Sequence, residues 1–303
     1  MRVTLWGTRG SLATPGPETV RYGGNTSCVE VRGSDGTLLV LDAGTGIRRL
    51  GANLGPDAGR VDVLLTHLHM DHIQGLGFFR PLDQPGQEVH IWGPPSTTLD
   101  LQARLSRYLS PPLFPVRLRE LLCRLTLHDV PLQGFEIGEL KIVAALVCHP
   151  GPTVGYRITE GGVSIAYIPD HEPALGARRF PEQSDWTSGF DLAAGADLLI
   201  HDAQYSAAEY SQRVGWGHSA LLHAVGFAAA AEVKRLVTFH HDPGHDDAAL
   251  DRLIDEARSS VEASFEFIPG TEGARFDLGP RNHPSVDVPA ASAARNHGRR
   301  GIM

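Results

Sequence analysis

The chain has 303 residues, 42% of them apolar, and a formal net charge of −8 at pH 7. This length and apolar content allow a sizeable core in one large domain or in two average ones. The acidic balance argues against a protein that coats long nucleic acid, because phosphate binding depends on Lys and Arg, and the lack of a run of about eighteen apolar residues argues against a membrane-spanning helix.

The first half of the chain alternates apolar segments with loops that are rich in glycine and polar residues. Apolar segments bounded by turn signals predict strands at residues 2–6, 27–32, 37–41, 61–66 and 88–92. Helices are predicted at residues 73–79 and 97–110, followed by a proline-stiffened loop at 110–115.

The second half contains further strands and two longer helices. The strands are predicted at residues 140–148, 154–159, 163–168 and 235–239, and the helices at 219–233 and 246–258. Alternation of strands and helices predicts an α/β fold in which two sheets pack together with helices outside.

The pattern of elements stops near residue 280. The residues beyond it are polar and rich in Pro, Ala and Arg, a composition that buries too little apolar surface to fold alone. We therefore predict one domain at residues 1–279 and a disordered tail at residues 280–303.

The densest chemical signal follows the strand at 61–66, where His67, His69, Asp71 and His72 lie within six residues. Imidazole and carboxylate ligands suit zinc and related transition ions. Side chains at i and i+2 of an extended chain point the same way, so His67 and His69 can share one ion. Asp71 and His72 lie past the turn and can reach a neighbouring ion.

This run resembles the His-x-His-x-Asp-His signature of the metallo-β-lactamase superfamily. Three further candidates stand at the ends of later predicted strands in the family order, namely His149, Asp170 and His240. The resemblance covers residues 1–278 and implies a four-layer αββα sandwich. It also implies two divalent metal ions, with zinc as the first choice and manganese or iron as alternatives.

The resemblance implies a division of the ligands between the two ions. One ion would be bound by His67, His69 and His149. The other would be bound by Asp71, His72 and His240, and Asp170 would bridge both. Between them, the ions would lower the pKa of a bridging water toward neutrality and provide a hydroxide nucleophile.

The motif Gly217-His218-Ser219 brings the chain closest to the branch that contains ribonuclease Z and related phosphodiesterases. Such chains place this motif, an alanine-rich helix, a strand and the last ligand histidine in that order, which favours His240 over His241. The resemblance also implies that His218 protonates the leaving oxygen, with Asp202 keeping it protonated. The alternative is that His218 only caps the helix or packs on Trp216.

Other residues are assigned weaker roles. Asp71 is grouped with His218 and Asp202 as catalytic, as well as with the ligands. Asp42 is expected to accept a hydrogen bond from a ligand imidazole, to cap its own turn, or both. His201 is expected to be structural and His171 to lie at the pocket edge. Candidate substrate contacts are Arg9, Arg21, Asn25 and Tyr205.

The arginine-containing segment 104–124 is open to three interpretations: a short substrate lid, a contact between two copies of the chain, or a solvated helix. The last two are favoured. A homodimer therefore remains open as an alternative to a monomer.

The three cysteines, Cys28, Cys123 and Cys148, are odd in number and widely spaced, which does not suit a disulfide framework. The amino-terminal residues also lack a signal-peptide pattern. We therefore expect a cytoplasmic protein that binds neither membranes nor extended nucleic acid.

The sequence and the resemblance together predict a dinuclear metal-dependent phosphodiesterase. Its partner would be a small anionic substrate such as a cyclic nucleotide, attacked by metal-bound hydroxide with His218 as general acid. Three alternatives remain: a ribonuclease Z-like endonuclease acting on tRNA 3′ ends, a lactone, thioester or β-lactam hydrolase, and a non-enzymatic sensor with a metal site.

Overall fold

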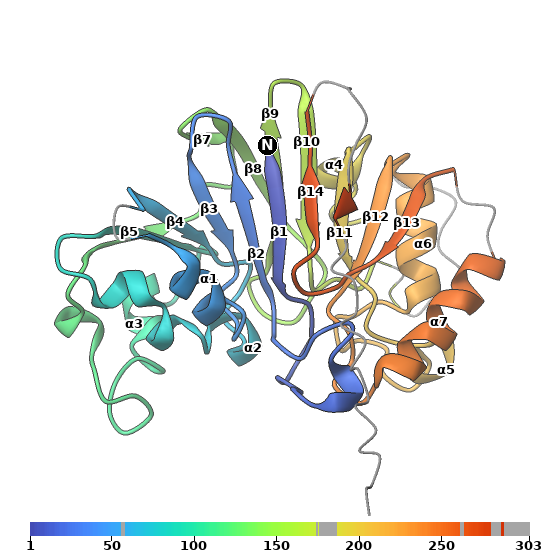
Figure 1. Ribbon diagram of the computed structural model, residues 1–303, viewed down its shortest axis with the longest axis horizontal. Coiled ribbons are helices and arrows are strands. Elements are labelled where there is room, and N and C mark those ends of the chain that lie inside the picture. Colours follow the sequence, from blue (N-terminus) through green and yellow to red (C-terminus); the bar gives the residue numbers. More distant parts are fainter. Residues whose placement is uncertain (56–57, 174, 176–186, 261–263, 280–285, 288–303) are drawn as a thin grey trace, which may run out of the picture.

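The computed structural model describes residues 1–55, 58–173, 175, 187–260, 264–279 and 286–287. Two mixed β-sheets form its centre (Figure 1). The strands of the first sheet are β1 (Arg2–Gly7), β2 (Cys28–Arg32), β3 (Leu38–Leu41), β4 (Val61–Leu64), β5 (Glu88–Gly93), β6 (Arg124–Asp129), β14 (Arg275–Asp277) and β15 (Val286–Asp287). They are arranged in the order β15-β14-β1-β2-β3-β4-β5-β6.

The second sheet has the order β13-β12-β11-β10-β9-β8-β7. Its strands are β7 (Phe135–Ile137), β8 (Leu140–Leu146), β9 (Val154–Glu160), β10 (Val163–Ile168), β11 (Leu198–Asp202), β12 (Arg235–Phe239) and β13 (Glu266–Pro269). Strands β10 to β13 run parallel to one another, as do β3 to β6 in the first sheet.

The helices lie outside the two sheets. They are α1 (Ile47–Asn53), α2 (Met70–Ile73), α3 (Leu101–Leu105), α4 (Phe190–Ala193), α5 (Ala207–Tyr210), α6 (Leu221–Ala230) and α7 (Asp247–Ser260). Short 3-10 helices occupy Pro17–Thr19, Leu76–Phe78, Arg80–Asp83 and Leu118–Glu120. No described helix is long and apolar enough to cross a lipid bilayer.

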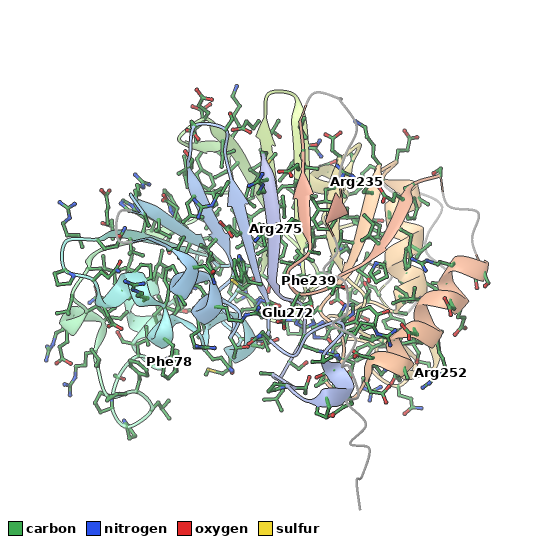
Figure 2. All side chains as sticks on the ribbon, in the orientation of Figure 1. Phe78, Arg235, Phe239, Arg252, Glu272 and Arg275 are labelled. Atoms are coloured by element: carbon green, nitrogen blue, oxygen red, sulfur yellow. The ribbon has the colours of Figure 1, made fainter. Side chains whose placement is uncertain are left out.

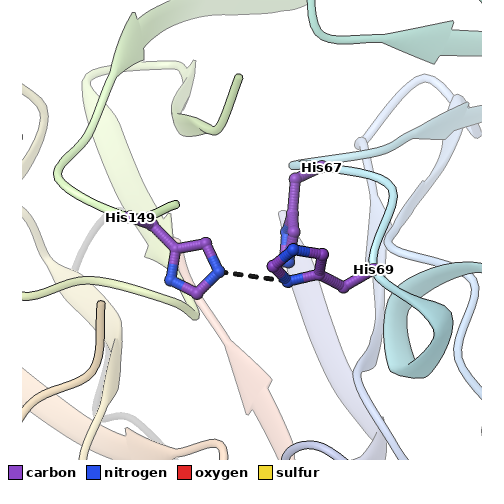
Figure 3. Close-up of side chains that lie close together, drawn as sticks. All are labelled: His67, His69 and His149. Carbon is purple, nitrogen blue, oxygen red and sulfur yellow. Dashed lines mark hydrogen bonds between the residues drawn. The ribbon is translucent and has the colours of Figure 1, made fainter. Parts of the chain in front are cut away.

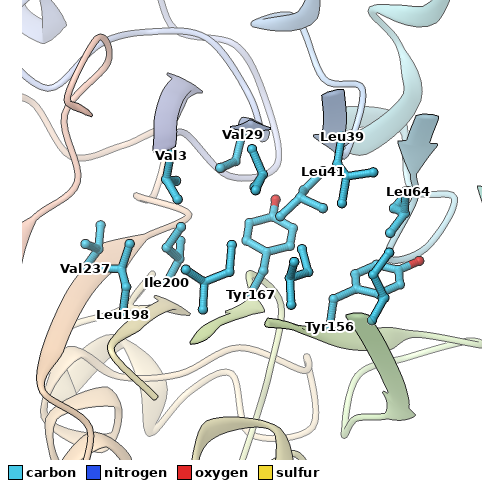
Figure 4. Packing of buried hydrophobic residues seen from close by; sticks show 14 of the residues in the cluster. Val3, Val29, Leu39, Leu41, Leu64, Tyr156, Tyr167, Leu198, Ile200 and Val237 are labelled. Carbon is cyan, nitrogen blue, oxygen red and sulfur yellow. The ribbon is translucent and has the colours of Figure 1, made fainter. Parts of the chain in front are cut away.

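Three apolar clusters separate the layers. The central one lies between the sheets, where Leu39 and Leu41 of β3 share a cluster with Tyr156 and Tyr167 of the second sheet (Figure 4). The alternate residues of the same strands, such as Leu38 and Val40, join a second cluster with α1, as expected from the two-residue period of a strand. The third cluster packs α4 and α6 against the second sheet. The predicted α/β sandwich of four layers is therefore confirmed.

Figure 2 shows how the side chains are distributed between the interior and the surface. Phe239 lies in the interior, in the central cluster, whereas Phe78 lies at the periphery with 61% of its surface exposed. Arg252 projects outward from α7 in the same view.

Two predicted helices were wrong in their extents. The helix expected at 73–79 instead forms α2 and a separate 3-10 turn. Gly75 lies between the two and packs so tightly that a Cβ there would come within 2.1 Å of the Gly44 carbonyl oxygen. The helix expected at 97–110 begins only after Asp100, whose carboxylate accepts a hydrogen bond from the Ala103 amide and fixes the start of α3.

The domain boundary stays a prediction. Residues 280–285 and 288–303 lie outside the described residues, so the predicted disorder is not tested there. Val286–Asp287 do not match a structureless tail, because they form β15, which pairs antiparallel with β14.

Candidate metal centre

The carboxyl ends of six strands meet at one edge of the two sheets. Asp42 follows β3, His67 follows β4 and His149 follows β8, while Asp170, Asp202 and His240 stand at the ends of β10, β11 and β12. Parallel strands place their carboxyl ends together, which is where open α/β sheets bind ligands. The topology therefore gathers residues that lie far apart in the sequence.

His67, His69 and His149 form one cluster whose ligand atoms lie within 4.8 Å of one another. Figure 3 shows the His149 ring facing His67 and His69 from a separate segment of the chain, with Nε2 of His149 3.2 Å from Nδ1 of His69. Nδ1 of His149 lies 2.8 Å from the Gly217 carbonyl oxygen, so it carries the proton and leaves Nε2 free to bind a metal.

Asp71, His72 and His240 form a second cluster of the same kind. Nε2 of His240 lies 3.1 Å from Oδ2 of Asp71 and 3.3 Å from Nε2 of His72. The opposite ring nitrogens are occupied, because Nδ1 of His72 donates to Asp42 over 2.8 Å and Nδ1 of His240 donates to Gln204 Oε1 over 3.0 Å. Both Nε2 atoms therefore face the same small volume.

Asp170 lies between the two clusters. Its Oδ2 is 3.7 Å from Nε2 of both His67 and His149, whereas its Oδ1 is 3.0 Å from Nε2 of His72 and 3.4 Å from Nε2 of His240. Each oxygen thus faces one cluster, as a bridging carboxylate would.

The electrostatics of the centre favour a bound cation. Nε2 of His67 and Oδ1 of Asp170 are buried and have no hydrogen-bond partner among the described residues. Burial lowers the pKa of His67 well below its ordinary value, so its imidazole is neutral, as a ligand must be. Burial also lowers the pKa of His72, but Asp170 and Asp71 outweigh this effect and raise it well above its ordinary value. The buried carboxylates of Asp71 and Asp170 therefore favour positive charge beside them.

His218 and Asp202 form a hydrogen-bonded pair beside both clusters. Nδ1 of His218 lies 2.7 Å from Oδ2 of Asp202, and the His218 ring stacks on His240 at 4.9 Å between centroids. Asp202 is held in place by the backbone N–H groups of His171 and Gln204. Burial lowers the pKa of His218, but the Asp202 carboxylate raises it to about 9, so the imidazole is positively charged at neutral pH.

The loop before His218 is fixed by Glu172, a buried residue that the sequence did not single out. Its carboxylate accepts hydrogen bonds from the backbone N–H groups of Gly215 and Gly217 and from the Tyr210 hydroxyl. This contact holds the Gly217 carbonyl oxygen in position to orient His149.

Replacing Gly217 with alanine should disrupt this loop. The residue has φ +86°, and a Cβ would lie 2.3 Å from Pro150 Cδ and 2.4 Å from His149 Nδ1. Gly215→Ala is a matched control, because Gly215 has φ +85° but no atom within 4 Å of its Cβ position. Both variants should lose about 1–2 kcal/mol of stability from left-handed strain. Only Gly217→Ala should also weaken metal binding, measured by elemental analysis after dialysis; equal metal retention would contradict this role.

Backbone strain is concentrated at the same edge. Ser11, Asp42 and His240 have φ of 58°, 57° and 60°, a region that non-glycine residues seldom adopt. The backbone N–H of Ser11 donates to Asp71, and a Cβ on Gly10 would lie 2.3 Å from His240 Nδ1. The amino-terminal loop therefore packs directly against the second cluster.

Four other histidines near the centre do not contribute to the two metal-binding clusters. His241 turns away from the centre and its Nε2 lies 2.9 Å from the Gly270 carbonyl oxygen, while His245 pairs with Glu209. His201 is buried and bonded to the Asp202 carbonyl oxygen, in keeping with a structural role. His171 is fully buried against His201 and Ser188, so its predicted place at the pocket edge was wrong.

Two of the four candidate substrate contacts are corrected by their burial. Arg9 is fully buried, and its guanidinium donates to the backbone carbonyl oxygens of Gly23, Asp242 and His245, so a substrate cannot reach it. Tyr205 is 2% exposed and packs edge-on against the His218 ring instead of facing solvent.

The other two candidates are held by acidic residues. Arg21 pairs with Asp251 on α7 at 2.6 Å. Asn25 is fastened to Glu272 through both its backbone and its side chain, and it lines a separate hollow of about 320 Å³. Neither residue belongs to the metal-binding clusters.

A larger cavity of about 460 Å³ opens beside the first cluster, with His67 and His69 in its wall. Much of the remaining wall comes from residues 94–113. These residues overlap the segment 104–124, for which the sequence favoured a contact between copies or a solvated helix. Arg104, Arg107 and Tyr108 of that segment line the cavity. A substrate lid was one interpretation of this segment but was not favoured, because the sequence does not show the contact of the Tyr108 hydroxyl with the Gln74 carbonyl oxygen that holds the segment beside α2.

Comparisons with known proteins agree with this geometry. Residues 37–241, more than half of the chain, match the model of the beta-lactamase superfamily domain. A ribonuclease Z from Haloarcula marismortui is 28% identical, with 86% of this chain and 92% of that protein covered.

Solved structures show the same fold at low identity. Zn²⁺-bound PqqB from Methylobacterium extorquens superposes with a TM-score of 0.67 at 20% identity, covering 92% of this chain and 100% of that one. A diphosphatase of the PhnP family gives a TM-score of 0.66 at 18% identity, covering 92% and 98%. With its clusters of histidine and aspartate suited to divalent metal ions, the chain belongs to the beta-lactamase superfamily, in the branch that contains ribonuclease Z, and is a metal-dependent hydrolase.

Proposed function

We propose that the protein is a dinuclear phosphodiesterase that hydrolyses a small anionic phosphodiester. One divalent ion would be bound by His67, His69 and His149, and the other by Asp71, His72 and His240, with Asp170 shared between them. The mixed imidazole and carboxylate donors favour zinc, with manganese or iron as alternatives. When bound, the ions would activate a water molecule and neutralise the phosphoryl oxygens.

The protein's own residues would then orient the centre and move one proton. Asp42, Gln204 and the Gly217 carbonyl oxygen hold three ligand imidazoles in a single tautomer. His218, charged at neutral pH, would donate its Nε2 proton to the departing oxygen, while Asp202 on Nδ1 positions the ring and stabilises its charged form.

The 2.7 Å hydrogen bond between His218 and Asp202 carries this proposal. An alkoxide is a poor leaving group, so cleavage of an alkyl phosphodiester gains much from a positioned acid. Asp202 is fully buried, and Nδ1 of His218, which it holds, lies 3.9 Å from Asp170 Oδ2, so the ring stands beside the metal-binding clusters. A lactone or thioester hydrolase has less need of such a pair.

Ribonuclease Z-like cleavage of tRNA is the second candidate, favoured by the relative from Haloarcula marismortui. The net charge of −8 favours a small substrate instead, because gripping a folded RNA requires an extended basic surface. We also propose that the protein acts without membrane association.

A substrate panel tests these assignments on zinc-loaded protein. It contains a cyclic nucleotide, the 5′-(p-nitrophenyl phosphate) of thymidine, a precursor tRNA and an acyl-homoserine lactone. Turnover of the small phosphodiesters with a higher kcat/KM than the other two substrates is expected. A preference for precursor tRNA would favour the nuclease, and turnover of the lactone alone would refute the phosphodiesterase.

The choice between neighbouring histidines gives a separate prediction. His240→Ala should lose metal from the second cluster, because Nε2 of His240 faces Asp71 and His72. His241→Ala is the matched control and should retain the metal content of the unaltered protein, since its imidazole bonds to Gly270. Elemental analysis of both variants decides the matter; a loss confined to His241→Ala would reverse the assignment.

A further inference from the structure

The cavity beside the metal centre has an unusual charge for this chain. Although the protein contains 35 acidic residues, its described lining includes no Asp or Glu but two arginines, Arg104 and Arg107. An electropositive hollow on an acidic protein favours an anionic ligand and raises its local concentration.

The two arginines differ in whether their side chains already have partners within the protein. Arg104 has a side chain that is only 13% exposed, and it donates to the Pro94 carbonyl oxygen over 2.8 Å while lying 3.4 Å from Asp129. Arg107 is exposed, and its side chain has no ion pair or hydrogen bond within the described part of the chain. Arg107 is therefore the cation of the cavity that remains available to a ligand.

The cavity also offers apolar surface around this charge. Met70, Leu99 and Leu113 line it with 50%, 38% and 70% of their surfaces exposed. A volume of about 460 Å³ lies in the range of pockets that enclose a small organic molecule. The wall therefore suits a ligand that combines an apolar or aromatic body with a negative group.

Arg107 comes from a different part of the cavity wall than the metal-binding histidines, since His67 and His69 belong to the loop after β4. The scissile phosphate would lie where Asp170 and His218 meet the two clusters, and residues 94–113 contribute to neither cluster. The metal ions would already balance the charge of that phosphate. A planar guanidinium on another wall suits a different anion, which it can bind through two parallel hydrogen bonds.

We propose that Arg107 binds a second anionic group of the substrate, a phosphate or carboxylate distinct from the scissile phosphodiester. The substrate class is then a nucleotide-sized phosphodiester with an additional negative group. This inference rests on the proposed phosphodiesterase function for the position of the scissile group, but the binding role of Arg107 can be measured without turnover.

Calorimetric titration of the zinc-loaded full chain with two ligands tests the proposal. Adenosine 3′,5′-bisphosphate should bind more tightly than adenosine 5′-monophosphate by roughly 10- to 100-fold, the range for one charge-assisted hydrogen-bonding contact. Arg107→Ala should remove this preference. Arg119→Ala is the matched control and should keep it, because Arg119 is an exposed arginine of the same segment that lines a different hollow.

Three results would overturn the proposal: equal affinity of the unaltered protein for both ligands, a preference that survives in Arg107→Ala, or an equal loss for both ligands in that variant. The last result would place Arg107 on the group at the metals. If the binding pattern holds but no phosphodiester in the panel is cleaved, the proposed function fails while the role of Arg107 in anion binding stands.

Discussion

Replacing His67 with alanine will remove metal and hydrolytic activity together. Nε2 of His67 is buried, lacks a hydrogen-bond partner among the described residues and faces both His149 and Asp170. Loss of a residue that merely orients a ligand costs about 10- to 100-fold in metal affinity, so loss of a ligand should cost more. Elemental analysis and kcat/KM on the same preparation measure the two effects.

His90→Ala provides the control for this variant. His90 is a partly buried histidine within β5, and it pairs with His128 and Glu88 outside the metal-binding clusters. It should retain metal and activity. Full metal content in His67→Ala, or metal loss in both variants, would contradict the assigned centre.

His218→Ala will slow cleavage according to the leaving group while metal content stays unchanged. A phosphodiester that releases an alkoxide should lose roughly 10²- to 10⁴-fold in kcat, the usual contribution of a positioned acid. One that releases nitrophenolate needs little protonation and should lose much less. Asp202→Asn should show the same pattern more weakly, because Asp202 positions and charges the imidazole of His218 without donating the proton itself.

The loss in kcat with the alkoxide leaving group, divided by the loss with nitrophenolate, distinguishes acid catalysis by His218 from a structural role. His218 packs against His149, Tyr205 and His240, so its removal could also loosen the ligands. Loosened ligands would slow both substrates equally and lower the metal content. Equal losses on the two leaving groups would therefore refute the general acid and leave the phosphodiester assignment without its main support.

Sequence patterns predicted most of the central strands and few of the peripheral ones. Strands such as β3 and β10 are buried, apolar and bounded by turn signals, so their pattern is unambiguous. The unpredicted strands β6, β7, β13 and β14 are short or partly exposed. Strand β11 was also not predicted, although it is buried along its whole length. The sequences of these short or partly exposed strands carry no clear apolar pattern, so pairing with a neighbouring strand decides that they become strands.

The candidate ligands could be predicted because His67, His149, Asp170 and His240 follow strands whose ends meet at one edge, and because His69, Asp71 and His72 belong to the same short motif as His67. The sequence pattern also favoured His240 over His241, and the structure turns only His240 toward the clusters. The support for these ligands could not be predicted. Glu172 and Gln204 act through contacts with residues distant in the sequence, and the burial of Arg9 depends on carbonyl oxygens from two separate loops.

A metal titration of metal-free protein tests the central claim most directly. Zinc is added in steps while bound metal per chain and hydrolysis of the 5′-(p-nitrophenyl phosphate) of thymidine are followed together. The two clusters joined by Asp170 predict that full activity requires about two bound ions per chain and that the first ion alone supports little turnover. Full activity at one ion per chain, or activity in its absence, would contradict the dinuclear phosphodiesterase.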